Sequence, residues 1–448
     1  MARLFQRAAL VWGFFLGCCP VFRGVTEEAA TVLILSLDQA VEAAVEQSFS
    51  LQKSALDLNV AQYAADHLWS ELFPAISLGA GLSYGTPLFT GQGFQVDKSG
   101  LGYNVSAGLN VSLQGGLPSA IKIIELAYKS ELLNYENARQ QLEIQVTKTF
   151  YTLLADQTRL DFLAESLDLA EKQQEKSRVA FEYGLIGEMS YLQTRLSVET
   201  AKFELHKGRT AYDTTLRDFL FLLGYAQTEE SRPVVLEGSL VIRSLDADPE
   251  TLILRYLAKR PDILSMRQQI ERLHYQETRT ILDARAPSLS LSAQWRGNGG
   301  GAGDFSDTLS GSLNLSIPLD PWIPGTKKSQ SITEAGTAVE KARLDLKNTE
   351  HTAMSQIRSL TANLRSSWAS IEIARFRAEI AERTYTLTEQ GFQQGTVEFL
   401  ELEDTRRKWA EARQQLIDGE LAYGLMILDL AAALNIDWRS IAQHGNES

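Results

Sequence analysis

Cysteine and long apolar runs are both scarce in this chain of 448 residues. The two cysteines, Cys18 and Cys19, are adjacent and lie near the N-terminus, so the rest of the fold relies on no disulfide. After the first 23 residues, no stretch is apolar over the roughly eighteen residues that a membrane-spanning helix needs, which excludes a transmembrane helix.

The chain also lacks an excess of positive charge and any recognisable catalytic or metal-binding motif. The formal net charge is −13, which argues against nucleic acid as a partner. The five histidines are scattered without the spacing of metal ligands, and no nucleophile stands in a pattern with a base. We therefore expect neither a cofactor nor an enzyme.

Glycine and proline are scarce over most of the chain and gather in three places, 79–102, 297–303 and 318–325. Strong apolar periodicity fills the segments between them, which excludes a disordered chain. This pattern favours long helices that are interrupted by short, glycine-rich β segments.

The N-terminal segment predicts export. A short basic stretch precedes an apolar run over 8–16, the layout of a cleaved secretory signal covering 1–23. The tetrapeptide that ends at Cys19 also resembles a bacterial lipoprotein box, with a small residue before Cys18. Ordinary cleavage and lipidation at Cys18 or Cys19 both remain open.

The two halves of the chain repeat each other. The hexapeptide Phe181–Ile186 recurs as Phe392–Val397, and Gly224 is answered by Asn435 at the same spacing. Duplication on this scale indicates that the fold is built from two similar units.

The first repeat, 24–224, is predicted to contain a helix, strands near 76–84 and 103–114, a long helix over 118–183, a tip at 184–187 and a helix over 188–224. The second repeat, 248–435, is predicted to contain a helix, strands near 288–296 and 308–317, a long helix over 326–394, a tip at 395–397 and a helix over 398–435. The segment 225–247 links the repeats, and 436–448 forms a short tail.

The four predicted strands have the length and alternation of membrane β-strands. Apolar residues alternate with serine, glycine and asparagine over about ten residues in each strand. We expect one face toward lipid, with Leu78, Leu82, Leu109, Val111, Leu291 and Leu313. We expect the other face of the sheet to line a lumen, with Ser77, Ser83, Asn110, Ser290 and Asn314. The stretch Gly297–Gly303 is predicted as a surface loop between two strands.

Four such strands cannot close a barrel, because an open sheet edge in lipid leaves backbone groups unpaired. Three copies give twelve strands. The long helices are each about 100 Å, and the two shorter helices of each repeat can stack end to end beside them. The predicted fold is thus a mixed α and β membrane protein, with an α-barrel of long antiparallel coiled-coil helices and a trimeric 12-stranded β-barrel.

Four short motifs of this sequence resemble those of a known family. Tyr183–Ile186, Gly395–Val397, Arg260–Ile263 and Ser316–Leu319 resemble, in order and spacing, motifs of the TolC-type outer-membrane efflux proteins. The resemblance implies a homotrimeric channel-tunnel in outer-membrane lipid that extends into the periplasm. It further implies a passive export duct of a tripartite efflux or type I secretion system, opened when a periplasmic adaptor and an inner-membrane transporter dock.

A second hypothesis is a periplasmic coiled-coil structural or adaptor-like protein without a pore. Adaptors have one helical hairpin and no paired ten-residue strands of this kind. The two strand pairs therefore favour the channel.

The resemblance also assigns candidate sites. Gly184, Leu185, Ile186, Gly395, Thr396 and Val397 would form the tips that contact the adaptor. The alternative is that both glycines are only helix C-caps, but the same motif at the same place in both repeats favours the tips. Glu401 and Asp404 match paired acidic residues of a periplasmic gate ring and would favour cations. The alternative is a solvated acidic face at a helix N-terminus. Polar groups that lock the gate in the family are replaced here by Met189, Ser190, Phe392 and Val397.

Overall fold

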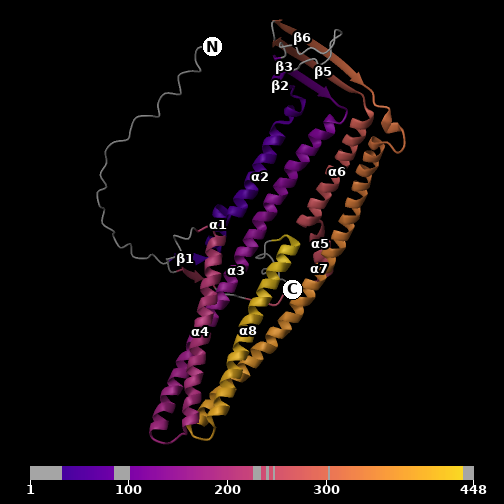
Figure 1. The fold of residues 1–448 in the computed structure, drawn as a ribbon. Helices are drawn as coiled ribbons and strands as arrows, with labels where there is room; N and C mark the ends of the chain where they lie inside the picture. The colour runs from indigo at the N-terminus through magenta and orange to yellow at the C-terminus, as the bar shows by residue number, and fades with distance from the viewer. Residues whose placement is uncertain are drawn as a thin grey trace, which may run out of the picture.

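The computed structural model describes residues 33–84, 101–225, 234–238, 242–245, 248–300 and 303–436. The molecule is elongated, with a β-sheet at one end and two helical hairpins at the other (Figure 1). The predicted signal segment, with Cys18 and Cys19, lies outside the described residues. Each helix in the described ranges is too short or too polar to cross a membrane.

The first helix begins at a capping box formed by Ser36 and Gln39. Strand β1 (Leu33–Ser36) leads into α1 (Leu37–Gln47), and Ser36 donates its backbone N–H to the Gln39 side chain at 3.0 Å. Ser48 has an extended backbone (ψ 123°), which separates α1 from α2 (Phe49–Asp66).

Helix α2 does not continue as far as the strand that follows it. The α-helix stops at Asp66, and a 3₁₀ turn, η1 (Leu68–Leu72), replaces its last part. Pro74 requires an extended residue before it, and Phe73 has ψ 135°, so the chain leaves the helix before the strand begins.

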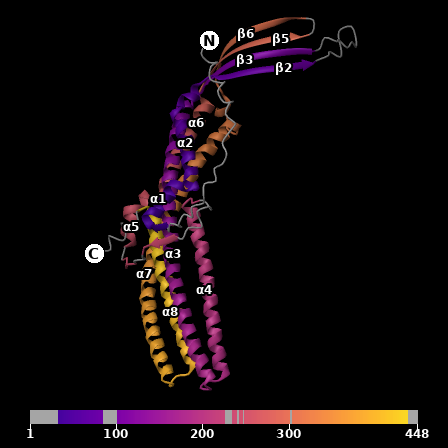
Figure 2. The ribbon, with the colours of Figure 1, turned by 90° about the vertical axis from the view of Figure 1, so that its left-hand side faces the viewer.

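Two very long helices form the frame of the molecule. They are α3 (Leu117–Glu182) and α7 (Lys327–Gln393), of 66 and 67 residues. Helix α4 (Glu188–Leu222) packs on the lower half of α3, and α8 (Phe399–Leu434) packs on the lower half of α7 (Figure 2). Above them, α2 packs on α3, so the shorter helices stack end to end beside the long one, as predicted.

The second repeat opens with two helices where one was predicted. Asp248 caps α5 (Pro249–Tyr256) by accepting the Thr251 backbone N–H at 2.9 Å. A 3₁₀ turn, η3 (Leu257–Lys259), then separates α5 from α6 (Pro261–Arg285), which packs on α7. The break arises because Pro261 forces Arg260 into extended backbone (ψ 137°) and then starts the new helix.

The segment between the repeats contributes one strand. Strand β4 (Val234–Glu237) pairs in parallel with β1, so the start of the first repeat and the linker form a small two-stranded sheet. Strand β4 of the linker therefore packs against the helices, with Leu236 in their apolar core.

A four-stranded antiparallel sheet caps the other end of the molecule. Its order is β2 (Ala75–Tyr84), β3 (Leu101–Leu113), β5 (Ser288–Gly300) and β6 (Gly303–Ser316). Val111 stands opposite Leu291, which stands opposite Leu313, and the apolar positions therefore share one face. Asn110 stands opposite Ser292 on the other face. The register thus gives the whole sheet one apolar and one small polar face.

The predicted loop at Gly297–Gly303 is wrong for its first part, because β5 continues to Gly300. Aromatic rings from the neighbouring strands explain this. A Cβ at Gly299 would lie 2.4 Å from the Tyr103 hydroxyl, and one at Gly297 would lie 2.5 Å from the Phe305 ring. The glycines therefore make room for rings that cover the strand, rather than forming a loop.

Two apolar clusters hold the helices together. In the first, Phe150 of α3 packs with Phe219 and Leu223 at the end of α4 and with residues of α1, β1 and β4. In the second, Ile371 of α7 packs with the fully buried Tyr423 of α8. The Tyr423 hydroxyl also accepts the Leu245 backbone N–H at 2.9 Å, which fastens the linker to this core.

Candidate functional site

Both hairpin tips have the same backbone turn. Gly184 and Gly395 have left-handed backbones, with φ of +71° and +75°. The following N–H groups donate to carbonyls five residues back, Leu185 to Ala180 at 2.8 Å and Thr396 to Gly391 at 2.9 Å. This is the Schellman C-cap, so the structure places both glycines in the capping role considered from the sequence.

The same turn closes the other two helices of the hairpins. Gly224 has φ +85° and Asn435 has φ +55°, and these are the residues that answer each other in the repeat. The next N–H groups donate to Leu220 and Ala431, each at 3.1 Å. The sequence duplication is thus also a duplication of backbone geometry.

The tips lie at the end of the molecule remote from the sheet (Figure 1). Leu185 is 77% exposed there, Thr396 is exposed, and Ile186 and Val397 are partly covered. A Cβ at either tip glycine would meet nothing within 4 Å, so only backbone conformation requires glycine. The geometry leaves the tips accessible, while contact with an adaptor stays a prediction.

Residues that replace the family's polar lock make apolar contacts here. The Phe392 ring packs edge-on against Phe399, with centroids 6.2 Å apart. A Cβ at Gly391 would lie 2.7 Å from a Val397 methyl group, so that side chain covers the glycine. Both contacts lie within the second hairpin, and Met189 on α4 is exposed.

The candidate gate residues Glu401 and Asp404 lie on the first turns of α8. Glu401 is exposed, whereas Asp404 contacts Arg407 and Lys408, each at 2.6 Å. The pKa of Asp404 lies below its usual range, because Lys408 and then Arg407 donate hydrogen bonds to the carboxylate. Arg407 also lies 3.9 Å from Glu411, one turn farther along the helix.

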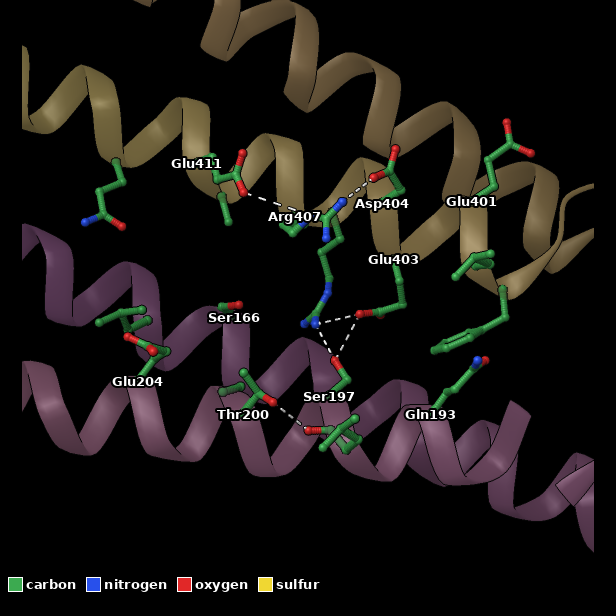
Figure 3. A pocket seen from close by; sticks show the side chains of 18 of the residues that line it. Ser166, Gln193, Ser197, Thr200, Glu204, Glu401, Glu403, Asp404, Arg407 and Glu411 are labelled. Atoms are coloured by element: carbon green, nitrogen blue, oxygen red, sulfur yellow. Dashed lines mark hydrogen bonds and ion pairs between the residues drawn. The ribbon is translucent and has the colours of Figure 1, made fainter. Parts of the chain in front are cut away.

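These side chains border an open groove of about 1080 Å³ between α3, α4 and α8. Figure 3 shows Asp404, Arg407 and Glu411 along α8, facing Thr200 and Glu204 of α4 across the groove. The structure thus brings both predicted gate residues to one groove beside the tips.

A link between the two hairpins crosses the same groove and was not predicted from the sequence. Glu403 of α8 accepts hydrogen bonds from Ser197 of α4 at 3.0 Å and from Arg406 at 2.9 Å, and Arg406 also contacts Ser197. The Arg406 Nη1 atom is buried and has no partner. Because Ser197 and Glu403 are far apart in the sequence, no local pattern indicates this contact.

Behind the link, an aromatic cluster joins three helices. Trp409 of α8 stacks on Tyr385 of α7, with centroids 5.2 Å apart, and meets Phe162 of α3 edge-on at 5.3 Å. Burial raises the pKa of Tyr385 to about 12. Higher up, Arg159 of α3 forms an ion pair with Asp418 of α8, so α3 and α8 are tied along their length.

The arginine of the Arg260–Ile263 motif is buried, with 9% of its side chain exposed. It forms a two-pronged ion pair with Asp262. It also donates to the Ala433 carbonyl of α8 at 2.9 Å and to Gln356 of α7 at 3.1 Å. The motif therefore fastens the start of α6 to the upper end of the second hairpin.

Within the part of the chain that the structure describes, no three His, Cys, Asp or Glu side chains are arranged to hold a metal ion.

Comparisons with known proteins agree with this architecture. The family model for outer membrane efflux proteins matches residues 40–225 and 252–435. The probable efflux pump outer membrane protein TtgC of Pseudomonas putida is 25% identical over 436 residues, which cover 92% of this chain and 85% of that protein. The outer membrane protein TolC of Escherichia coli is 21% identical over 403 residues, which cover 86% and 79%.

A solved structure shows the same fold. The CmeC outer membrane channel of Campylobacter jejuni superposes with a TM-score of 0.72 and 18% sequence identity, covering 92% of this chain and 89% of that one. Since the family model matches well over half of the sequence, this chain belongs to the outer membrane efflux protein family.

Proposed function

We propose that this outer-membrane efflux channel is the passive duct of a tripartite efflux or type I secretion system. In this proposal three copies form a ring, the hairpin tips receive a periplasmic adaptor, and an inner-membrane transporter supplies the cargo. The main support for docking is that the two hairpin tips share one backbone turn and are exposed at the end remote from the sheet.

Two unpaired edges support the ring. Within the described ranges, β2 and β6 each pair with a strand on one side only. Exposed apolar stripes run along α2 and α4 on one edge and along α7 on the other, opposite the faces that pack inside the chain. The stripes consist of Phe49, Leu56, Val60 and Tyr63 on α2, Met189, Leu192, Leu196 and Phe203 on α4, and Ile373, Phe376, Ile380 and Leu387 on α7.

The heights of these stripes match. Phe203 and Ile380 each lie about four helical turns from their own tip, so they meet when one copy stands beside the next. Because the two edges differ, the contact is head-to-tail and closes only as a ring. Three copies supply twelve strands, which are enough for a membrane barrel.

The sheet register supports the orientation of the barrel. The apolar face with Leu78, Leu82, Leu109, Val111, Leu291 and Leu313 faces lipid in this proposal. The polar face with Ser77, Ser83, Asn110, Ser290 and Asn314 faces the lumen. Toward the far end of the apolar face stand Tyr84, Tyr103 and Phe305, as in the aromatic girdle of membrane barrels.

The gate in this proposal is the ring of Glu401 and Asp404 beside the tips. Its closed position is supported by the Ser197–Glu403–Arg406 link, which joins the second hairpin to the first. Opening then requires α8 to move away from α4, and this movement breaks the link.

A substitution at the tip tests the proposed docking. Leu185→Asp places a charge on the exposed tip and should abolish export in the native host while the purified protein still forms conducting channels. Leu254→Asp is the matched control, because Leu254 is 88% exposed on α5, away from the tips. Normal export by the Leu185→Asp variant, or an equal loss with Leu254→Asp, would contradict docking at the tips.

A further inference from the structure

Two cations accompany the candidate gate carboxylates. Arg407 and Lys408 lie three and four residues after Asp404, so the helix places all three on one face. Both side chains reach the Asp404 carboxylate at 2.6 Å, yet they are 69% and 65% exposed. Both charges are therefore open to solvent as well as to Asp404, and Arg407 also lines the groove.

The electrostatic consequence follows from the separations. Charges a few ångströms apart act as one group on a solute, because the Debye length is about 8 Å at physiological ionic strength. Glu401 and Asp404 contribute two negative charges per chain, and Arg407 and Lys408 contribute two positive charges. These four charges cancel, while Glu411, which lies 3.9 Å from Arg407, keeps the surroundings acidic. The group is therefore less negative than a bare carboxylate ring.

We propose that Arg407 and Lys408 set the charge selectivity of the channel by partly neutralising the Glu401 and Asp404 ring, so that the constriction prefers cations much less than a bare carboxylate ring would. This inference rests on the proposed position of the two carboxylates at the constriction. It changes the expectation from the sequence, in which the carboxylates alone made the channel prefer cations.

Reversal potentials of the purified channel in a planar bilayer under a KCl gradient test the proposal. Arg407→Gln combined with Lys408→Gln exposes the carboxylates, and the ratio of K⁺ to Cl⁻ permeability should rise by roughly tenfold at low salt. Block by Mg²⁺ should also appear at lower concentration. Glu401→Gln combined with Asp404→Asn removes two negative charges per chain and keeps both cations, so the ratio of K⁺ to Cl⁻ permeability should fall below that of the wild type.

The matched control is Lys172→Gln, because Lys172 forms an equally short pair with Asp168 on α3 and does not line the groove. Its permeability ratio should equal that of the wild type. If the acidic variants change the ratio but the Arg407 and Lys408 variants do not, the inference fails while the proposed gate stands. If neither double variant changes it, the carboxylates lie away from the constriction, and both proposals fail.

Discussion

The left-handed residues at the helix ends allow backbone strain to be separated from steric clash. Gly184 and Gly224 have similar φ values, +71° and +85°, but different surroundings. A Cβ at Gly184 meets nothing within 4 Å, whereas one at Gly224 would lie 2.6 Å from the carbonyl oxygen of Gln47 at the end of α1. Alanine at the two positions should therefore destabilise the protein by different amounts.

The magnitudes follow from these two terms. Gly184→Ala forces an alanine into the left-handed region and should cost about 1–2 kcal/mol. Gly224→Ala adds a close contact between backbones that cannot turn away, and overpacking of that kind adds about 1–3 kcal/mol. We therefore expect Gly224→Ala to lower the free energy of unfolding by about 2–5 kcal/mol.

Asparagine provides the control, because the second repeat already uses it at Asn435 with φ +55°. Gly224→Asn tolerates the backbone but keeps the clash, so it should remain destabilising, whereas Asn435→Gly should change stability by less than about 1 kcal/mol. Urea unfolding in detergent, followed by circular dichroism at one protein concentration, measures these differences. Equal costs for alanine at Gly184 and Gly224 would refute the argument from the Gln47 contact.

Three further predictions concern the sheet, the buried arginine and the link between hairpins. Val111→Arg should cost about 2–4 kcal/mol and reduce the yield of assembled protein on gels, while Asn110→Arg should not, if the apolar face meets lipid. Arg260→Ala should lower the free energy of unfolding by about 3 kcal/mol, because it removes two bonds to α7 and α8 and leaves Asp262 unpaired. Arg139→Ala removes only an exposed pair and should cost less than about 1 kcal/mol in the same urea titration. Arg406→Ala should speed amide hydrogen exchange in the first turns of α8. Unchanged protection there would show that the Ser197–Glu403–Arg406 link does not stabilise this part of the helix.

Much of the fold could be predicted because its signals are local. Left-handed helix ends demand glycine or asparagine, so Gly184, Gly224, Gly395 and Asn435 mark four helix ends in sequence. The strands could also be predicted, since the alternation of apolar and small polar residues is visible within each strand's own sequence. The ion pairs of Asp404 also had a local signal in the spacing of Arg407 and Lys408.

The remaining features depend on contacts between distant residues. The pairing of β1 with β4 joins four-residue strands that are too short to show a pattern. Glycines at the end of β5 indicated a loop, because nothing in their own sequence reveals the Tyr103 and Phe305 rings above them. The Ser197–Glu403 contact arises only when the two hairpins pack together.

Disulfide cross-linking of the two free edges tests the central claim of a closed ring most directly. Phe203→Cys and Ile380→Cys place one thiol on each edge at matching height. Oxidation in native membranes should link up to three chains and no more, whereas each single variant should remain unlinked across this interface. Monomers alone, or a ladder that continues beyond three chains, would contradict the trimeric duct.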